Sequence, residues 1–317
     1  MTDSAKLYLG VDGGQSSTTA VIGDEHGRVL GVGKGGPCNH VSTAEAKARF
    51  SEAIGGALLS ARETAGVSDA AFDAACLGLS GGPADKDALS REIVRAKKYR
   101  ITHDADIALS GATAGEPGII VIAGTGSIAY GRNAGGETAR AGGWGYIFGD
   151  EGGAFDIVRQ ALRAVLRYEE GWGQATALRD ALLDAAGETS ANSLLHRFYT
   201  PEFPRQKIAA FAKVVDETAQ QGDRVAMELL NSAAQTLTSL ATTVRHRLFE
   251  ESEIVTVAYI GGVFQSRSVR ERFRILVELS DGCTVQAPRY GPAHGALIEA
   301  YRLAGLPAEP TGTEEHL

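Results

Sequence analysis

The feature that most constrains this fold is a repeated pattern of an apolar segment, a glycine-rich turn and a second apolar segment. The pattern occurs first as LGVDGGQSSTTAVIGDEHG, from Leu9, and again as IVIAGTGSIAYGRNAGG, from Ile120. The two turns are about 112 residues apart, and a self-similarity of this kind indicates an internal duplication. Each copy predicts a meander of three strands, because short apolar runs separated by glycine turns are typical of strands.

Between and after the meanders, apolar residues recur at helical spacing, as in 43–66 and over much of 153–250. Strands that alternate with helices predict an α/β fold, and the duplicated meanders predict two related domains with a cleft between them. We expect a first domain at 1–116 and a second at 117–291. A closing helix is expected at 292–305, and it could pack back on the first domain and complete it.

Charge and composition exclude several classes of protein. The net charge is −8 and no run of Lys and Arg forms a stripe, which argues against a nucleic-acid partner. The sequence contains no stretch of about 18 apolar residues, so no membrane span is predicted. The first predicted strand begins too close to the N-terminus to leave room for a signal peptide. The three cysteines, Cys38, Cys76 and Cys283, are far apart and match no metal-ligand spacing. These features predict a cytoplasmic protein, and homodimerisation stays open.

Three glycine-rich turns follow apolar strands, at 12–18, 124–127 and 261–264. The Walker pattern is absent, because GVGKGG (31–36) has neither its spacing nor its hydroxyl, and no GxGxxG precedes a helix. Successive N–H groups in a tight turn can still bind an anion. Ligands of α/β folds gather at the carboxyl ends of strands, so the three turns together predict a ligand site.

The motifs VDGGQSST, THDAD, IAGTGS, GGWGYIFGDEG and IGGVF occur in this order along nearly the whole chain. The set resembles the BadF/BadG-type branch (BadF/BadG/BcrA/BcrD) of the sugar kinase, Hsp70 and actin superfamily, and within it the N-acetylglucosamine and glucosamine kinases. The resemblance implies two ribonuclease-H-like, actin-like ATPase domains with an interdomain cleft. It also implies that ATP and Mg²⁺ are the cofactors and that a small sugar is the other substrate.

The same resemblance implies which residues hold the nucleotide. Asp12 lies near the Mg²⁺, since a carboxylate beside an anion-binding turn can share a cation with phosphate. The first phosphate loop comprises Gly13, Gly14, Gln15, Ser16 and Thr18. The second comprises Gly124, Thr125, Gly126 and Ser127. In the adenosine motif, Gly261 and Gly262 leave ligand space that a Cβ would fill.

The resemblance aligns Asp104 with the catalytic base, which must accept the proton of the attacking sugar hydroxyl. Asp106 is the rival, and it is the better candidate for a cap or supporting residue if a helix begins there. For the sugar pocket, the motifs indicate Asn39, Asp104, Gly143, Trp144, Gly145 and Asp150. Glu151 is ambiguous, because it could instead stabilise the N-terminus of a helix that begins near Gly153.

The leading hypothesis is an ATP-dependent kinase that phosphorylates the 6-hydroxyl of N-acetylglucosamine. Glucosamine is the alternative acceptor, because the sequence does not show which side chains face the 2-nitrogen. A remoter alternative is an activator ATPase of the 2-hydroxyacyl-CoA dehydratase type, which holds an iron–sulfur cluster with cysteines. The arrangement of Cys38, Cys76 and Cys283 does not reproduce that set of cysteines. A sugar-sensing regulator without catalysis is a further alternative, which the two phosphate loops and Asp104 argue against.

Overall fold

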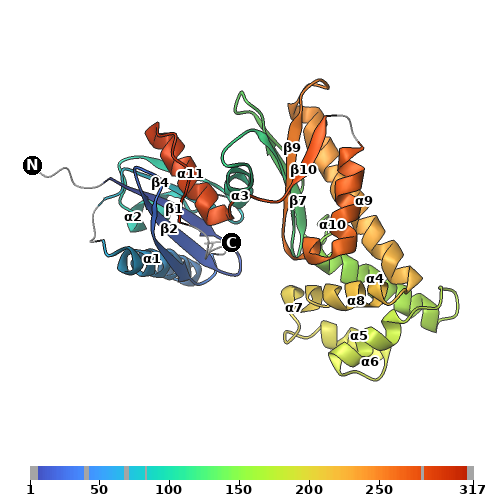
Figure 1. The fold of residues 1–317 in the computed structure, drawn as a ribbon. Helices are drawn as coiled ribbons and strands as arrows, with labels where there is room; N and C mark the ends of the chain where they lie inside the picture. The colour runs from blue at the N-terminus through green and yellow to red at the C-terminus, as the bar shows by residue number, and fades with distance from the viewer. Residues whose placement is uncertain (1–5, 39–42, 68–70, 83, 280–281, 313–317) are drawn as a thin grey trace, which may run out of the picture. The chain divides into compact units, whose positions relative to one another are not determined.

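The computed structural model describes residues 6–38, 43–67, 71–82, 84–279 and 282–312. The chain divides into two compact units (Figure 1). Unit 1 comprises Met1–Pro117 and Pro288–Leu317, and unit 2 comprises Gly118–Ala287. The C-terminal segment of unit 1 contains helix α11 (Pro292–Ala304), which packs against strand β1 and helix α3 of the same unit.

Unit 1 contains a five-stranded mixed sheet in the order β3-β2-β1-β4-β5. Its strands are β1 (Leu7–Gly13), β2 (Thr18–Asp24), β3 (Val29–Gly35), β4 (Ala74–Leu79) and β5 (Tyr99–His103). Its other helices are α1 (Ala44–Ala65), α2 (Asp87–Ile93) and α3 (Asp104–Thr113). The first three strands form the predicted antiparallel meander, and β4 then pairs with β1 in parallel.

Unit 2 repeats this topology with a sheet in the order β10-β9-β6-β7-β8. Its strands are β6 (Gly118–Ala123), β7 (Ser127–Arg132), β8 (Thr138–Gly142), β9 (Val255–Ile260) and β10 (Cys283–Gln286). If β6 to β10 are numbered as β1 to β5, both strand orders read 3-2-1-4-5. The α/β fold with two units of duplicated topology is therefore confirmed.

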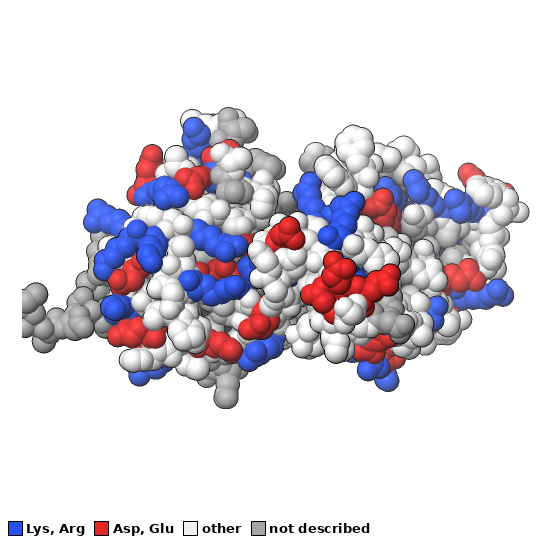
Figure 2. Space-filling view, turned by 90° about the horizontal axis from the view of Figure 1, so that it is seen from above, with Lys and Arg blue, Asp and Glu red and all other residues white. Residues whose placement is uncertain are grey.

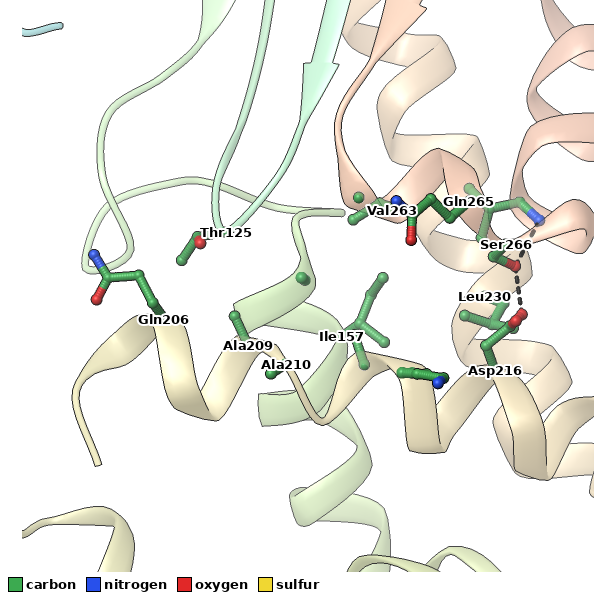
Figure 3. Close-up of a pocket in the computed structure, with 15 residues that line it drawn as sticks. Thr125, Ile157, Gln206, Ala209, Ala210, Asp216, Leu230, Val263, Gln265 and Ser266 are labelled. Carbon is green, nitrogen blue, oxygen red and sulfur yellow. Dashed lines mark hydrogen bonds between the residues drawn. The ribbon is translucent and has the colours of Figure 1, made fainter. Parts of the chain in front are cut away.

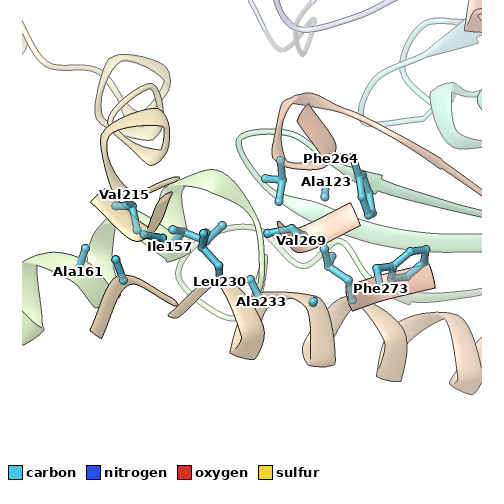
Figure 4. Packing of buried hydrophobic residues seen from close by; sticks show 14 of the residues in the cluster. Ala123, Ile157, Ala161, Val215, Leu230, Ala233, Phe264, Val269 and Phe273 are labelled. Carbon is cyan, nitrogen blue, oxygen red and sulfur yellow. The ribbon is translucent and has the colours of Figure 1, made fainter. Parts of the chain in front are cut away.

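The helices of unit 2 separate β8 from β9 and then β9 from β10. They are α4 (Ala154–Glu169), α5 (Leu178–Ala186), α6 (Ala191–Phe198), α7 (Arg205–Ala209), α8 (Ala212–Gln220), α9 (Arg224–Leu248), the 3-10 helix η1 (Gly262–Gln265) and α10 (Arg267–Glu278). Buried residues of α4, α8, α9, η1 and α10 form one apolar core with the inner face of the sheet, part of which is shown in Figure 4.

Helices cover both faces of the sheet of unit 1. Alternate residues of a strand point to opposite faces, so each strand contributes to two cores. Leu9 and Val11 belong to the core beneath α1, whereas Tyr8 belongs to the core beneath α11. Glycines let both helices approach closely: a Cβ on Gly10 would lie 2.3 Å from the backbone nitrogen of Leu297 in α11. Gly31, Gly33 and Gly35 lie against the backbone of α1 in the same way, which explains a glycine run that matches no phosphate-binding motif.

None of the described helices is long and apolar enough to cross a membrane. On the face that Figure 2 shows, Lys and Arg side chains alternate with Asp and Glu over both units. Charges of both signs are therefore interspersed on that face.

The close approach at Gly10 gives a testable prediction for stability. Gly10→Ala should lower the free energy of unfolding by about 3 kcal/mol, because the added methyl overpacks the β1–α11 contact. Gly56→Ala on α1 is the matched control: its Cβ would meet nothing within 4 Å, so it should raise stability by about 0.5–1 kcal/mol. Urea unfolding followed by circular dichroism measures both changes, and equal effects would contradict the proposed contact.

Candidate active site

Parallel pairing in unit 1 brings the predicted catalytic residues to one edge of the sheet. Strands β1, β4 and β5 are parallel neighbours, so their carboxyl ends coincide. Asp12 lies at the end of β1, and Asp104 is the first residue of α3, directly after β5. The Asp104 carboxylate accepts a hydrogen bond from the N–H of Ala105 at 2.9 Å, which orients it at the helix start.

Asp12 and Asp104 interact electrostatically. Burial raises the pKa of Asp12 from 3.8 to about 7, and repulsion from the Asp104 carboxylate adds to that rise. A cation or a donor facing Asp12 would relieve both effects, since each penalises the ionised form. The pair is therefore a region of excess negative potential at the edge where ligands of this fold class gather.

The DGG turn forms a tight loop between β1 and β2. The N–H of Gly14 donates to the carbonyl of Ser17 at 3.0 Å, and Gln15 and Ser16 are exposed at the tip. Thr18 departs from the predicted role in phosphate binding. Its side chain is fully buried, and its hydroxyl donates to the carbonyl of Gly36 at 2.7 Å and contacts the sulfur of Cys38 at 3.0 Å. Thr18 therefore fixes the turn to the segment after β3, out of reach of a ligand.

Asp106 has a structural environment. Only 1% of its surface is exposed, and its carboxylate accepts hydrogen bonds from Arg100 at 2.7 Å and from the hydroxyl of Thr102 at 3.0 Å. Arg100 also pairs with the buried Glu299 of α11 at 2.9 Å. This network ties the first turn of α3 to β5 and α11, so Asp106 supports the helix that presents Asp104.

A residue that the sequence analysis missed is Lys86, whose side chain is fully buried. Its ammonium donates to the carbonyl oxygens of Ser80 and Gly82 and to the carboxylate of Asp85, at 3.1–3.2 Å. These bonds fix the loop after β4, which lies at the same edge as Asp12. Nothing in the segment ADKDALS distinguishes a buried lysine from a solvated one. Asn39, predicted to bind the sugar, lies outside the described residues.

In unit 2, the second glycine turn packs against the start of helix α4. The N–H groups of Ala154 and Phe155 donate to the carbonyl oxygens of Gly124 and Thr125 at 2.8 Å and 3.1 Å. A Cβ on Gly124 would meet open space, so nothing packs against the turn on that side, although the N–H of Gly124 donates to the carbonyl of Gly126 at 3.0 Å. Ser127 does not fit its predicted role: it is buried, and its hydroxyl donates to the carbonyl of Glu151 at 2.6 Å.

A cavity of about 530 Å³ begins at Thr125 and extends between α4, α7, α8, η1 and α10 (Figure 3). Thr125 and Gln206 lie at one end, and Asp216 and Ser266 lie at the other, joined by a short hydrogen bond. Apolar walls with a few polar groups at the ends are typical of small-molecule sites. The volume and the position beside a glycine turn suit a nucleotide, and the sequence analysis missed these polar residues because α7 and α8 carry no motif.

The two glycines of the predicted adenosine motif have different roles. Gly262 lines the cavity, and a Cβ there would meet open space, as predicted for a residue beside a ligand. Gly261 adopts φ 114°, and its Cβ would lie 2.4 Å from the carbonyl oxygen of Ala123. Glycine is required at 261 because the backbone of β6 is close, so the predicted ligand-space explanation is wrong for this residue.

The loop 143–150 displays the predicted sugar-binding side chains of unit 2. Gly143 and Gly145, on either side of Trp144, adopt φ 71° and 79°, a region that favours glycine. The indole of Trp144 is 65% exposed and lies 4.6 Å from the guanidinium of Arg140. An exposed aromatic face held between glycines can stack against the C–H face of a sugar.

Asp150 closes this loop against the second glycine turn. It adopts φ 62°, which is uncommon for a residue with a side chain but tolerated by Asp. Its carboxylate is largely buried, and one oxygen lies 2.3 Å from the position that a Cβ on Gly126 would take. The same oxygen accepts from Arg205 at 3.3 Å. Gly126 is therefore required for the contact between the turn and this carboxylate.

Comparisons with known proteins agree with this architecture. The profile of the BadF/BadG/BcrA/BcrD ATPase family matches residues 9–300. An N-acetylmuramic acid/N-acetylglucosamine kinase of Clostridium acetobutylicum is 32% identical, over 87% of this chain and 91% of the relative. An N-acetyl-D-glucosamine kinase of Dictyostelium discoideum is 32% identical, over 84% and 88%. A crystal structure from Chromobacterium violaceum, described as a candidate N-acetylglucosamine kinase, has a TM-score of 0.75 at 26% identity, over 92% of this chain and 98% of that chain.

Two units of one strand topology, each with a glycine turn at the carboxyl end of its first strand, define the class of actin-like, two-domain ATPases and sugar kinases. Within that class, the chain belongs to the BadF/BadG/BcrA/BcrD ATPase family. The resemblance inferred from the sequence motifs is thereby confirmed.

The raised pKa of Asp12 predicts how stability depends on pH. Between pH 3.8 and about 7, the Asp12 carboxyl is protonated in the folded protein and ionised in the unfolded chain. Asp12 therefore lowers the free energy of unfolding as the pH rises through that window. Without divalent cations, Asp12→Asn should be more stable than the native protein at pH 8, by up to about 4 kcal/mol. Urea unfolding at pH 5 and pH 8 measures this difference, and a difference that does not widen with pH would contradict the prediction.

Proposed function

We propose that this protein is an ATP-dependent kinase that transfers the γ-phosphate to the 6-hydroxyl of N-acetylglucosamine. The observation that carries the proposal is a carboxylate at a helix start, Asp104, which interacts with the half-buried Asp12 at the carboxyl edge of one sheet. Family membership supports ATP as the donor, and the relatives' named substrates support an amino sugar as the acceptor.

The nucleotide is assigned to the cavity of unit 2. Its apolar walls suit the base, and the open backbone at Gly262 allows close contact. Polar groups at the end formed by Asp216 and Ser266 suit ribose hydroxyls, because a carboxylate accepts and a hydroxyl both donates and accepts. Thr125 and the open space at Gly124 suit the phosphates at the opposite end.

Mg²⁺ fits the chemistry of unit 1. The ion binds through one or two carboxylates together with water and phosphate oxygens, so it needs no cluster of protein ligands. Asp12 is such a carboxylate, and its burial beside Asp104 leaves negative charge that a cation would neutralise. When bound, the ion would neutralise charge on the transferred phosphoryl group. Among the described residues, no cluster of three or more His, Cys, Asp and Glu side chains forms a metal site.

We assign the general base to Asp104. The carboxylate would accept the proton of the 6-hydroxyl as the oxygen attacks phosphorus, with ADP as the leaving group. Because the transition state of phosphoryl transfer is loose, orienting the hydroxyl matters more than the basicity of the carboxylate. The exposed indole of Trp144 and the carboxylate of Asp150 are assigned to the sugar, by stacking and by accepting hydroxyl hydrogen bonds.

Coupled ADP release tests the class of enzyme and its substrate together. We expect N-acetylglucosamine to give the highest kcat/KM among glucosamine, N-acetylglucosamine, N-acetylmannosamine, N-acetylmuramic acid and glucose. A higher value with glucosamine would establish the alternative acceptor. ATP hydrolysis that needs no sugar, in a coloured protein, would instead favour the activator ATPase.

The assignment of the base predicts that Asp104→Asn loses at least about 100-fold in kcat, because the amide cannot accept the proton. Sugar affinity, measured by titration calorimetry, should stay within about threefold, since the amide keeps one acceptor oxygen. Asp106→Asn is the matched control: it should lower the melting temperature through the Arg100 contact while most of kcat is retained. A larger loss of kcat in the Asp106 variant would reverse the assignment.

The assignment of the sugar face predicts that Trp144→Ala raises the KM for the sugar by about tenfold and leaves the KM for ATP within about twofold. Trp172→Ala is the matched control, because that indole is 66% exposed and also lies beside a guanidinium, that of Arg167, at 5.1 Å. Initial-rate kinetics in both substrates measure the shifts. Equal changes in the two KM values would place Trp144 outside the sugar site.

A further inference from the structure

Arg205 is the first residue of helix α7, and none of the sequence motifs includes it. The next residue, Gln206, lines the cavity at the end where Thr125 lies (Figure 3). Ala209 and Ala210 continue the same wall. Helix α7 thus forms part of the wall of the site that we assign to the nucleotide, and Arg205 directly precedes the wall residue Gln206.

The side chain of Arg205 reaches the second glycine turn through Asp150. Its Nη1 atom lies 3.3 Å from a carboxylate oxygen of Asp150, and that oxygen contacts the α-carbon side of Gly126. The guanidinium also lies 5.3 Å from the centre of the Tyr146 ring, which limits its rotation. A guanidinium is therefore held beside the second glycine turn, with the Asp150 carboxylate between them.

A guanidinium has five N–H donors in a rigid fork. Among the described residues, Asp150 is the hydrogen-bond partner that the structure shows for the side chain of Arg205. The remaining donors can bind a phosphate oxygen without breaking this ion pair, so the side chain can bridge a carboxylate and a phosphate. Lys213, which lines the cavity, is highly exposed and pairs with Glu217 at 3.7 Å, so it is not held toward the second glycine turn as Arg205 is.

We propose that Arg205 is a nucleotide-binding residue, oriented by Asp150, whose guanidinium contacts the terminal phosphates of ATP at the second glycine turn. The inference rests on the proposed function only in its assumption that the cavity binds ATP. It adds a cationic side chain to a phosphate site otherwise made of backbone and hydroxyl groups.

Titration calorimetry of the full chain with adenosine, ADP and a non-hydrolysable ATP analogue tests the proposal. Arg205→Gln should bind adenosine within about twofold of the native protein and bind the ATP analogue about 10- to 100-fold more weakly, because a charge-assisted hydrogen bond is lost. Arg205→Lys should restore part of the affinity, since it keeps the charge and lacks the fork. Unchanged adenosine binding also shows that the cavity of the variant is folded.

Arg197→Gln is the matched control, because Arg197 in α6 also pairs with a carboxylate, that of Glu188 at 3.0 Å, and also lies beside an aromatic ring, that of Phe203 at 4.8 Å. This variant should bind all three ligands as the native protein does. The proposal is overturned if Arg205→Gln binds the ATP analogue with native affinity, or if adenosine and the analogue are weakened equally. If the native protein binds none of the ligands, the proposed function itself fails.

Discussion

The parallel pairing of β1 with β4, and of β6 with β9, is the interaction on which the candidate site depends. Parallel neighbours end at the same edge of a sheet, so the turns that follow them are brought together. In unit 1 this edge carries Asp12 and the start of α3 with Asp104. In unit 2 it carries the glycine turn at 124–126 and the segment from Gly261 that lines the cavity.

The glycines of this chain serve three physical purposes that a sequence motif does not separate. Gly10 and the glycines of β3 let helices approach the sheet, and a side chain there would overlap helix backbone. Gly261 accommodates the neighbouring backbone of β6. Gly124 and Gly262 leave space for a ligand. Only this last group faces the space that we assign to the nucleotide, whereas the others set the close spacing of the layers.

Much of the fold followed from the sequence, because the meanders and their glycine turns are local patterns. The same reasoning assigned the general base to Asp104 and kept Asp106 as its rival, since both are acidic and two residues apart. Burial of Asp106 against Arg100 separates them. Thr18 and Ser127 were assigned to phosphate because a hydroxyl in a glycine turn suits it, yet both hydroxyls donate to backbone carbonyl groups. The direction of a side chain at a strand end depends on neighbours that are distant in sequence.

The sequence by itself determined the duplicated α/β topology, the family and the positions of the glycine turns, because these depend on hydrophobic periodicity and on residues adjacent along the chain. Tertiary structure alone decided which polar groups are available to a ligand. It buried Lys86 beneath the loop after β4, raised the pKa of Asp12 beside Asp104, and placed Arg205 next to Asp150, which is 55 residues away along the chain. Burial and electrostatic pairing are properties of atoms close in space, and the linear order of residues does not record that proximity.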